Sequence, residues 1–270
     1  MVRVRLTMRD MFLFTLVTTV GLLAAFFYMY ESSFAASVSP AFPGGAITIS
    51  FDDAWDSQFE NALPVLLEHN VPATFYVMTN PVKNGDYGYM NEAQVVALTR
   101  LGFEIGAHTK SHLDLTALSD EMLVEELVES KEYLEALTDR EMFSLAYPFG
   151  ATNQTVIDAL HTAGYTNGRS AAQAPRLGFS AEGQDVFTFG SFSPNTAVPL
   201  ERMKRAVDQA RERNQWFIFS FHQVGQYGGE YDTPPEDFAE IISYISGSEV
   251  PVISIANGVE RLTASVEFED

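Results

Sequence analysis

Two adjacent aspartates, Asp52 and Asp53, follow a run of residues that alternates like a β-strand, Ile-Thr-Ile-Ser-Phe at 47–51. An ionised carboxylate removed from water without a partner is very costly, so interior strands normally exclude aspartate. A cation is the simplest partner for such a pair. Successive strand residues face opposite sides of a sheet, so both carboxylates reach one pocket only if the strand ends here and residues 54–57 turn into a helix. The alternative is that one aspartate caps a helix beginning near Ser57.

A second candidate is the histidine pair His108 and His112, which follows an apolar strand ending at Ala107. A spacing of four residues predicts two imidazoles on one side of a helical turn, close enough to share a metal ion. With one carboxylate they would form a site of two histidines and one carboxylate that leaves positions open for water and substrate. Any two surface or capping histidines can have this spacing, so the pairing with Asp52 and Asp53 is what favours the metal interpretation.

Two further candidates come directly after strands. His222 ends the apolar strand 216–221, and the turn Tyr-Pro-Phe-Gly at 147–150 follows another strand. Proline and glycine make a turn by themselves, but such a turn can also aim a backbone N–H into a pocket. The other two histidines, His69 and His161, are expected at helix C-termini, where a cation suits the helix dipole, and we interpret both as structural.

Strands and helices alternate along the rest of the chain. Apolar runs of period two predict strands, and apolar residues at helical spacing predict the helices between them. The expected strands are residues 47–51, 73–78, 104–109, 143–147, 165–169, 216–221 and 250–255. A first helix is expected to open at 54–57, with Pro64 marking a kink or a late start, and a long helix is expected to be capped by Ser119. The other expected helices are 91–100, 153–163, 199–213, 235–246 and 257–263. Residues 171–183 are expected to form a polar loop.

About seven strand-helix units of this kind predict a parallel sheet with helices outside it, either doubly wound or closed into a barrel. In both architectures the chemistry gathers at the carboxyl ends of the strands. All of the candidate residues fall at such ends, which is what a shared site requires.

The composition fits one large globular domain with an appendage. The chain has 270 residues, of which 46% are hydrophobic and 19% charged, and it has no cysteine. Disulfides and cysteine-ligated metals are therefore excluded, so any metal must be held by histidines and carboxylates. The net charge of −20 argues strongly against a nucleic-acid partner, because no basic stripe is present to bind phosphate. Spread acidity is typical of a soluble surface, and attraction to a cationic polymer is the alternative.

The N-terminus has the pattern of a targeting element. Residues 11–30 contain no charge and follow Arg3, Arg5 and Arg9, the positive flank expected on the cytoplasmic side of a membrane. At about 1.5 Å per residue this run is long enough to span a bilayer as a helix. Its length favours an uncleaved signal anchor, whereas Ser-Phe-Ala at 33–35 favours cleavage by a signal peptidase.

These features predict the organisation of the chain. Residues 1–35 are expected to be a signal peptide or signal anchor, residues 36–45 a linker, and residues 46–270 the globular domain. The domain is then extracytoplasmic, either anchored to the membrane by one N-terminal helix or secreted after cleavage near Ala35.

Four motifs, taken in chain order, resemble those of the NodB-like polysaccharide deacetylases, carbohydrate esterase family four. They are Ser-Phe-Asp-Asp at 50–53, His-Thr-Lys-Ser-His at 108–112, Tyr-Pro-Phe-Gly at 147–150 and Phe-His at 221–222. Their order, and the context Pro-Ala-Thr-Phe-Tyr-Val at 72–77, make the resemblance specific beyond any single motif. It extends from residue 46 to the last helix and implies the family's distorted, incompletely closed (β/α) barrel.

The resemblance also implies an activity, the metal-dependent removal of N-acetyl groups from a glycan that contains N-acetylglucosamine. Asp53, His108 and His112 would bind a divalent metal, Zn²⁺ first, with Co²⁺, Ni²⁺ and Mn²⁺ as alternatives. Asp52 would be the general base that takes a proton from metal-activated water, and His222 the general acid that protonates the departing sugar nitrogen.

The oxyanion would be stabilised, as the resemblance suggests, by the backbone N–H of Phe149. In three places the chain departs from the family pattern. Many members carry an arginine two residues before the proline of the third motif, but this chain has Ala146 there. Arg169, at the end of the next strand, is the candidate replacement. The alternative is that Arg169 is an ordinary exposed arginine. Residues 171–183 hold no convincing counterpart of the fourth motif, Asp-Trp, and Ser220 stands where a larger apolar residue often lines the acetyl pocket.

Several functions stay open from the sequence. The glycan can be a chitin oligomer, poly-N-acetylglucosamine or peptidoglycan, and the same machinery would hydrolyse another amide, a cyclic imide or an O-acetyl ester. A glycan-binding domain whose catalysis has lapsed is a further alternative, against which the intact motif residues argue. The expected partners are a glycan substrate and, if the N-terminal helix is uncleaved, the membrane; we expect a monomer.

Overall fold

The structure, a computed structural model, describes residues 41–171, 178–180 and 183–264. The chain divides into two units, Met1–Pro40 and Ala41–Asp270, and the described elements all belong to the second unit. The predicted signal segment at 1–35, with its apolar run at 11–30, lies outside the described residues. Within the described ranges no helix combines the length and the apolar character that crossing a membrane requires.

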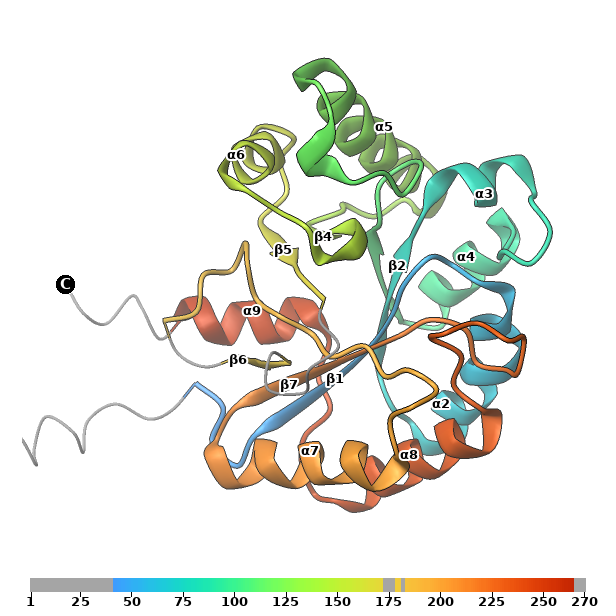
Figure 1. The fold of residues 1–270 in the computed structure, drawn as a ribbon, viewed down its shortest axis with the longest axis vertical. Helices are drawn as coiled ribbons and strands as arrows, with labels where there is room; N and C mark the ends of the chain where they lie inside the picture. The colour runs from blue at the N-terminus through green and yellow to red at the C-terminus, as the bar shows by residue number, and fades with distance from the viewer. Residues whose placement is uncertain (1–40, 172–177, 181–182, 265–270) are drawn as a thin grey trace, which may run out of the picture. The chain divides into compact units, whose positions relative to one another are not determined.

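A seven-stranded sheet lies at the centre of the second unit (Figure 1). Its strand order is β5-β4-β3-β2-β1-β7-β6, and all neighbours are parallel except β6 and β7. The strands are β1 (Ala46–Phe51), β2 (Ala73–Val77), β3 (Glu104–Ala107), β4 (Ser144–Ala146), β5 (Asn167–Arg169), β6 (Phe179–Ser180) and β7 (Trp216–Phe221). The sheet curls into a half-barrel, the shape of a (β/α) barrel that is left open.

The open side of the half-barrel is bridged by the segment that leads from β6 to the next helix. Phe189 forms a parallel bridge with Arg169 of β5, and Phe192 forms one with Phe219 of β7. These single pairs join the β5 edge to β7 where no regular strand forms. The expected incompletely closed barrel is therefore present in this form, and Arg169 belongs to the edge that the bridges fasten.

Helices cover the outside of the sheet, except the last one, which packs against Trp216 on the other face (Figure 1). The α-helices are α2 (Leu63–His69), α3 (Thr79–Asn84), α4 (Glu92–Arg100), α5 (Asp120–Thr138), α6 (Gln154–Thr162), α7 (Leu200–Arg213), α8 (Pro235–Gly247) and α9 (Ile255–Ala264). Three short turns accompany them, the π-helical η1 (Gln58–Ala62) and the 3₁₀ segments η2 (Leu115–Ala117) and η3 (Pro148–Gly150).

Side-chain N-caps begin three helices, and the predicted cap Ser119 is one of them. The side chains of Asn91, Ser119 and Asn153 each accept a hydrogen bond from a backbone N–H in the first turn of α4, α5 and α6. Such a bond satisfies one of the donors that a helix N-terminus leaves unpaired and is worth about 1 kcal/mol. These caps explain why sequence reasoning found the starts of these helices within one residue.

An aromatic cluster fixes the carboxyl end of β1. The Phe51 ring stacks on Phe75 of β2, with ring centroids 4.8 Å apart, and lies 5.9 Å from Phe221 of β7. All three rings are fully buried, which stabilises each by about 1.5–3 kcal/mol relative to exposure. Because Phe51 immediately precedes Asp52, this packing sets where the two aspartates leave the sheet.

Three elements differ from the sequence prediction, and one of them is the short helix α3, which was not expected. Residues 250–255 were expected as a strand, but they form only one bridge, between Val252 and Ile47, since Pro251 has no N–H for a ladder and α9 begins at Ile255. The expected loop at 171–183 contains the short strand β6, which packs a phenylalanine on β7.

The helix after β1 starts late, as Pro64 suggested. The π-turn η1 comes first, and α2 begins at Leu63 with Pro64 in its first turn, where the missing N–H costs nothing. The alternative that an aspartate caps this helix is wrong. Ser57 occupies the N-cap position, and no side chain makes a capping hydrogen bond there.

Candidate active site

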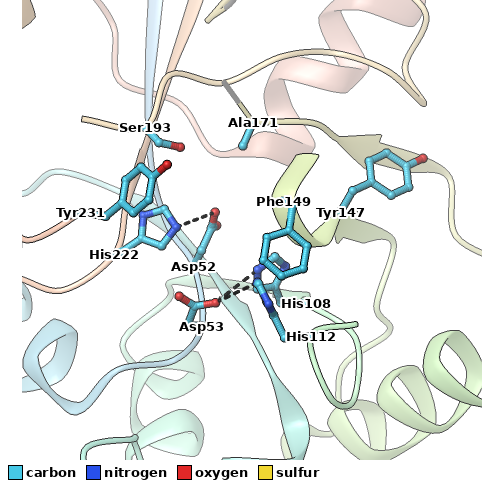
Figure 2. Close-up of a pocket in the computed structure, with 10 residues that line it drawn as sticks. All are labelled: Asp52, Asp53, His108, His112, Tyr147, Phe149, Ala171, Ser193, His222 and Tyr231. Atoms are coloured by element: carbon cyan, nitrogen blue, oxygen red, sulfur yellow. Dashed lines mark ion pairs between the residues drawn. The ribbon is translucent and has the colours of Figure 1, made fainter. Parts of the chain in front are cut away.

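The carboxyl ends of β1, β3, β4 and β7 surround a pocket of about 360 Å³ (Figure 2). Six of the seven predicted site residues line it, and the seventh, Arg169, is fully buried. The lining residues are Asp52, Asp53, His108, His112, Tyr147, Phe149, Ala171, Ser193, His222 and Tyr231. The structure therefore brings together residues that are up to 170 positions apart in the chain, since His222 and Asp52 share one pocket.

Asp53, His108 and His112 form a cluster with the geometry of a metal site. The Asp53 Oδ1 atom lies 3.4 Å from His108 Nε2 and 3.4 Å from His112 Nε2, and the three ligand atoms all lie within 4.8 Å of one another (Figure 2). Zinc bonds of about 2.0–2.2 Å in a tetrahedron separate two ligand atoms by about 3.3 Å. One carboxylate and two imidazoles spaced in this way fit a divalent metal and leave coordination positions free toward the pocket.

The turn after β1 is what directs Asp52 and Asp53 into the same pocket. Asp53 has φ 77° and Ala54 has φ 66°, so both adopt the left-handed conformation that non-glycine residues rarely take. Each such residue costs about 1–3 kcal/mol and persists only where surrounding contacts impose it. The prediction that the chain turns directly after the strand is confirmed, and the turn is tighter than a simple entry into a helix.

The loop from His108 to His112 is not the helical turn that their spacing predicted. Thr109 has φ 63° and His112 has φ 57°, so two of the five residues adopt the left-handed conformation. The Thr109 hydroxyl accepts a hydrogen bond from the His112 N–H at 3.1 Å, which closes the loop on itself. The imidazoles still meet, with ring centroids 4.8 Å apart, because this loop rather than a helix brings His112 back toward β3.

A buried glutamate of α5 supports that loop. One carboxylate oxygen of Glu126, Oε2, accepts the backbone N–H groups of Lys110 at 2.9 Å and Ser111 at 2.8 Å. Glu126 is only 4% exposed, so these two charge-assisted hydrogen bonds replace the water that it loses. Sequence reasoning missed this residue, although a glutamate on the core-facing stripe of an amphipathic helix, between Leu123 and Leu127, is a recognisable signal.

His108 is oriented by the backbone of β4. Its Nδ1 atom lies 2.8 Å from the Ala146 carbonyl oxygen. A carbonyl can only accept, so Nδ1 carries a proton and Nε2 is directed toward Asp53. A carbonyl partner of this kind is the usual way in which a metal-binding imidazole is held in one tautomer.

The charges in this cluster shift each other's pKa. Burial opposes ionisation of Asp53, but the hydrogen bond from His108 and the nearby imidazoles outweigh it and lower the pKa of Asp53 well below its usual value. Burial likewise lowers the pKa of His108, yet its bond to Asp53 prevails and raises that pKa. At His112, burial and the neighbouring His108 lower the pKa. The cluster is therefore an ionised carboxylate with one imidazole made more basic, His108, and one made less basic, His112, so protons compete with a metal chiefly at His108.

Asp52 lies on the other side of the pocket, between an arginine and a histidine. Its Oδ1 atom is 2.5 Å from Arg169 Nη2, and its Oδ2 atom is 3.9 Å from His222 Nε2 (Figure 2). Gln58 ties the two pocket residues together from behind, because its amide donates to the backbone carbonyls of Asp52 at 2.5 Å and His222 at 3.0 Å.

Arg169 reaches Asp52 because of the strand register. Arg169 of β5 is the direct neighbour of Ala146 of β4, so the arginine stands beside the position where many family members carry theirs. Its side chain is fully buried, packs over the Tyr76 ring at 4.8 Å and donates to Ser191 Oγ. The alternative of an ordinary exposed arginine is wrong, and the predicted replacement is in contact with Asp52.

Three serines form a chain of hydrogen bonds that leads from Arg169 to the pocket. Ser191 Oγ lies 3.0 Å from Ser220 Oγ, which lies 2.7 Å from Ser193 Oγ. Ser220, which we expected at the acetyl pocket, is fully buried, and Ser193 is the member of the group that lines the pocket. The polar Ser220 thus belongs to a hydrogen-bonded chain that holds Arg169, and sequence reasoning did not identify Ser193.

Aromatic rings flank the pocket on both sides (Figure 2). Phe149 is 70% exposed, has φ 58° and sets its ring edge-on to His112 at 4.6 Å, while Tyr231 lies 4.9 Å from the His222 ring. Within the described residues the buried Nδ1 atom of His222 has no hydrogen-bond partner.

The two histidines interpreted as structural lie away from the pocket. His69 is in the last turn of α2 and His161 in the last turn of α6, as predicted. A residue that sequence reasoning left unassigned does touch the site: the Trp55 indole donates to Asp53 Oδ2 at 2.9 Å.

Residues 40–168 match the family model described as polysaccharide deacetylase, and the fold and the pocket agree with that match. This match places the region that holds the first three motifs in the polysaccharide deacetylase family, the NodB-like carbohydrate esterases of family four. A poly-beta-1,6-N-acetyl-D-glucosamine N-deacetylase of Staphylococcus aureus is 26% identical over 141 residues, which are 48% of this chain and 49% of that protein. The chain thus spans about half the length of this curated relative.

Solved structures of the family share the fold. A family 4 carbohydrate esterase from Bacillus anthracis is 22% identical, with a TM-score of 0.55 over 80% of this chain and 83% of its own. The Xyl-CE4 domain of a multidomain xylanase from the hindgut metagenome of Trinervitermes trinervoides is 14% identical, with a TM-score of 0.58 over 80% and 90%. A CE4 family pseudoenzyme from Bacillus anthracis is 16% identical, with a TM-score of 0.56 over 80% and 66%. Because a pseudoenzyme shares the fold, an activity has to be argued from the pocket residues.

Proposed function

We propose that this protein is a metal-dependent hydrolase that removes N-acetyl groups from a glycan containing N-acetylglucosamine. The observation that carries the proposal is the convergence of Asp53, His108 and His112 beside Asp52 and His222 in one pocket. Three residues can hold a metal, and one carboxylate and one imidazole are left to move protons. That division of groups is what hydrolysis of an amide requires.

The metal site is formed by Asp53 Oδ1 and by the Nε2 atoms of His108 and His112. When bound, a divalent metal, Zn²⁺ first with Co²⁺, Ni²⁺ or Mn²⁺ as alternatives, lowers the pKa of water and polarises the acetyl carbonyl. The backbone N–H of Phe149, at the pocket rim, is proposed to donate to the oxygen of that carbonyl as it gains negative charge.

Asp52 acts as the general base. Arg169 holds its Oδ1 atom, so Oδ2 is the oxygen left to face the pocket and to take a proton from the attacking water. The water oxygen forms a bond to the acetyl carbon as that proton leaves. An arginine that never loses its charge is suited to this task, because it keeps the carboxylate in one orientation through the reaction.

His222 acts as the general acid. Its Nε2 atom lies near Asp52 and lines the same pocket, so a proton on Nε2 can pass to the sugar nitrogen when the carbon–nitrogen bond breaks. The products are acetate and a free amino sugar. Phe149 and Tyr231 flank the opening with rings on which a sugar face can stack.

The test is acetate release by the purified full chain from chitin oligomers, poly-N-acetylglucosamine and peptidoglycan, measured beside the metal content of the wild type and of His112→Ala. Loss of both metal and activity in the variant is the expected result. Metal retained by His112→Ala would overturn the ligand assignment. Acetate released only from O-acetyl esters, or ring opening of cyclic imides to their half-amides, would favour those substrates. Glycan binding without hydrolysis of any substrate would favour a lapsed enzyme.

We also propose that the domain works outside the cytoplasm, anchored by the apolar run at 11–30 or released after cleavage near Ala35, and that it is a monomer. The sequence supports this through the arginines that precede the run. Membrane fractionation and protease treatment of intact cells test the location, N-terminal sequencing tests cleavage, and light scattering tests the monomer. A domain protected from external protease in intact cells would overturn the location.

A further inference from the structure

The two oxygens of the Asp53 carboxylate have different partners. Oδ1 faces His108 Nε2 and His112 Nε2, each at 3.4 Å, while Oδ2 accepts the indole N–H of Trp55 at 2.9 Å. The proposed mechanism does not use Trp55. A hydrogen bond on the oxygen that points away from the ligand cluster nevertheless bears directly on how this carboxylate can bind a metal.

The indole is held rigidly in that position. Its ring stacks on Tyr89, with ring centroids 4.4 Å apart and planes 20° from parallel, and the two residues form an antiparallel bridge. The Met90 N–H donates to the Ala54 carbonyl at 2.8 Å. These contacts fasten the left-handed turn at residues 53–54 to the segment before α4, so the indole N–H is aimed at Asp53 before any metal arrives.

We propose that Trp55 is a positioning residue of the metal site, which holds Asp53 as a ligand through Oδ1 alone; this inference rests on the proposed function of that site. A free carboxylate can bind a metal through one oxygen or through both. The indole occupies Oδ2 and fixes the carboxylate plane. Tryptophan is only a donor, so it cannot itself compete for the metal.

The consequence is twofold. Without the indole N–H the carboxylate can rotate, so metal affinity falls by about 10- to 100-fold, the usual effect of removing a partner of a metal ligand. The freed Oδ2 can also add itself to the coordination sphere, which changes the geometry around the metal. A residue that served only the stability of the fold would change neither quantity in the folded protein.

The test is a titration of the metal-free full chain with Zn²⁺ against a competing chelator, together with the visible absorption of the Co²⁺-loaded protein. Trp55→Phe keeps a ring for stacking and removes the N–H. Trp216→Phe is the matched control, because this other tryptophan also donates its indole N–H, to Thr48 at 2.8 Å, and lies at the amino end of β7, the opposite end of the strand from His222.

We expect Trp55→Phe to weaken Zn²⁺ binding about 10- to 100-fold and to weaken the cobalt absorption bands as the coordination number rises, while Trp216→Phe leaves both unchanged. Affinity within about twofold of the wild type in Trp55→Phe, or an equal loss in Trp216→Phe, would overturn the inference. If Trp55→Phe does not fold, Tyr89→Leu is the second variant. It removes the ring on which the indole stacks, so Zn²⁺ affinity should fall by several-fold. Unchanged Zn²⁺ affinity in Tyr89→Leu would contradict the positioning role of Trp55. These are binding measurements, so a wild type that binds metal but releases no acetate would refute the function and leave this inference standing.

Discussion

Asp52 and Asp53 are adjacent in the chain, yet their carboxylates belong to two regions of the pocket that are held in different ways. We call Asp53, His108 and His112, which are proposed to bind the metal, the metal side. We call Asp52, His222 and Arg169, which are proposed to move protons or to support that step, the proton side. On the metal side the carboxylate is held by Trp55, two residues away, whereas on the proton side the partner of Asp52 comes from 117 residues further along the chain.

The difference follows from what each side must do. Metal ligands have to place their donor atoms within a few tenths of an ångström, so the residue types and the local turns that carry them are tightly specified. A charge partner needs only to bring a guanidinium to a carboxylate oxygen. Because Arg169 is the register neighbour of Ala146 on adjacent parallel strands, it can supply that guanidinium from the strand beside the usual one.

The largest effect is expected from separating the two aspartates. Asp53→Asn removes a charged metal ligand and should lose both metal and activity, whereas Asp52→Asn should keep the metal and lose about 10²- to 10⁴-fold in kcat, the usual contribution of a general base. Metal content by mass spectrometry and acetate release measure the two. If both variants lost metal equally, the division between the metal side and the proton side would be wrong.

Replacing Arg169 tests whether Asp52 depends on an arginine that comes from β5 and not from β4. Arg169→Ala leaves the buried Asp52 carboxylate unpaired, and we expect kcat to fall by about 10²-fold with metal affinity unchanged. Loss of such a partner can also destabilise the fold by about 3–5 kcal/mol, so the melting temperature is measured in parallel.

The matched control returns the arginine to the neighbouring strand. The double variant Ala146→Arg with Arg169→Ala should recover part of the activity, because the two positions lie side by side. Arg169→Ala with a rate within about twofold of the wild type, less than 0.5 kcal/mol of barrier, would show that Asp52 does not need this partner.

The sequence predicted the strand ends and the residues at them because those depend on local signals. β1 alternates apolar residues with Thr48 and Ser50, β7 is apolar except for Ser220, and charged or titratable residues follow directly where the two strands end. The contact between Arg169 and Asp52 was also predicted. Ala146, where the arginine of many family members is missing, and Arg169 lie at the carboxyl ends of consecutive strands, so both face the same edge of the sheet. Here strand order was sufficient, without any knowledge of side-chain positions.

The loop between His108 and His112 could not be predicted in the same way. Its two left-handed residues have no favourable local signal, and they persist because Glu126, from a helix that begins later in the chain, accepts two of the loop's N–H groups. The roles of Glu126 and Trp55 depend equally on tertiary contacts. The spacing therefore predicted that the two imidazoles meet, but it predicted the wrong backbone between them.

Glu126 supports the loop that carries His112 on the metal side. Glu126→Leu keeps the size of the side chain but leaves the N–H groups of Lys110 and Ser111 without their acceptor, so the loop that carries His112 should loosen. We expect metal affinity to fall about 10-fold. Glu129→Leu is the control, because Glu129 is on the same helix and contacts only the Lys110 ammonium. Equal affinities in both variants would show that the loop holds His112 unaided.

The smallest effect is expected at Gln58, the support of the proton side. Its amide donates to the backbone carbonyls behind Asp52 and His222, so Gln58→Leu should shift the two proton-moving groups relative to each other and lower kcat by several-fold without changing metal affinity. Asn61→Leu is the control, since Asn61 donates to the Val224 carbonyl one turn away and touches neither group. If Gln58→Leu lowered metal affinity as much as kcat, the two sides would be one cooperative unit. Their separate anchors in the structure argue that each can be weakened alone.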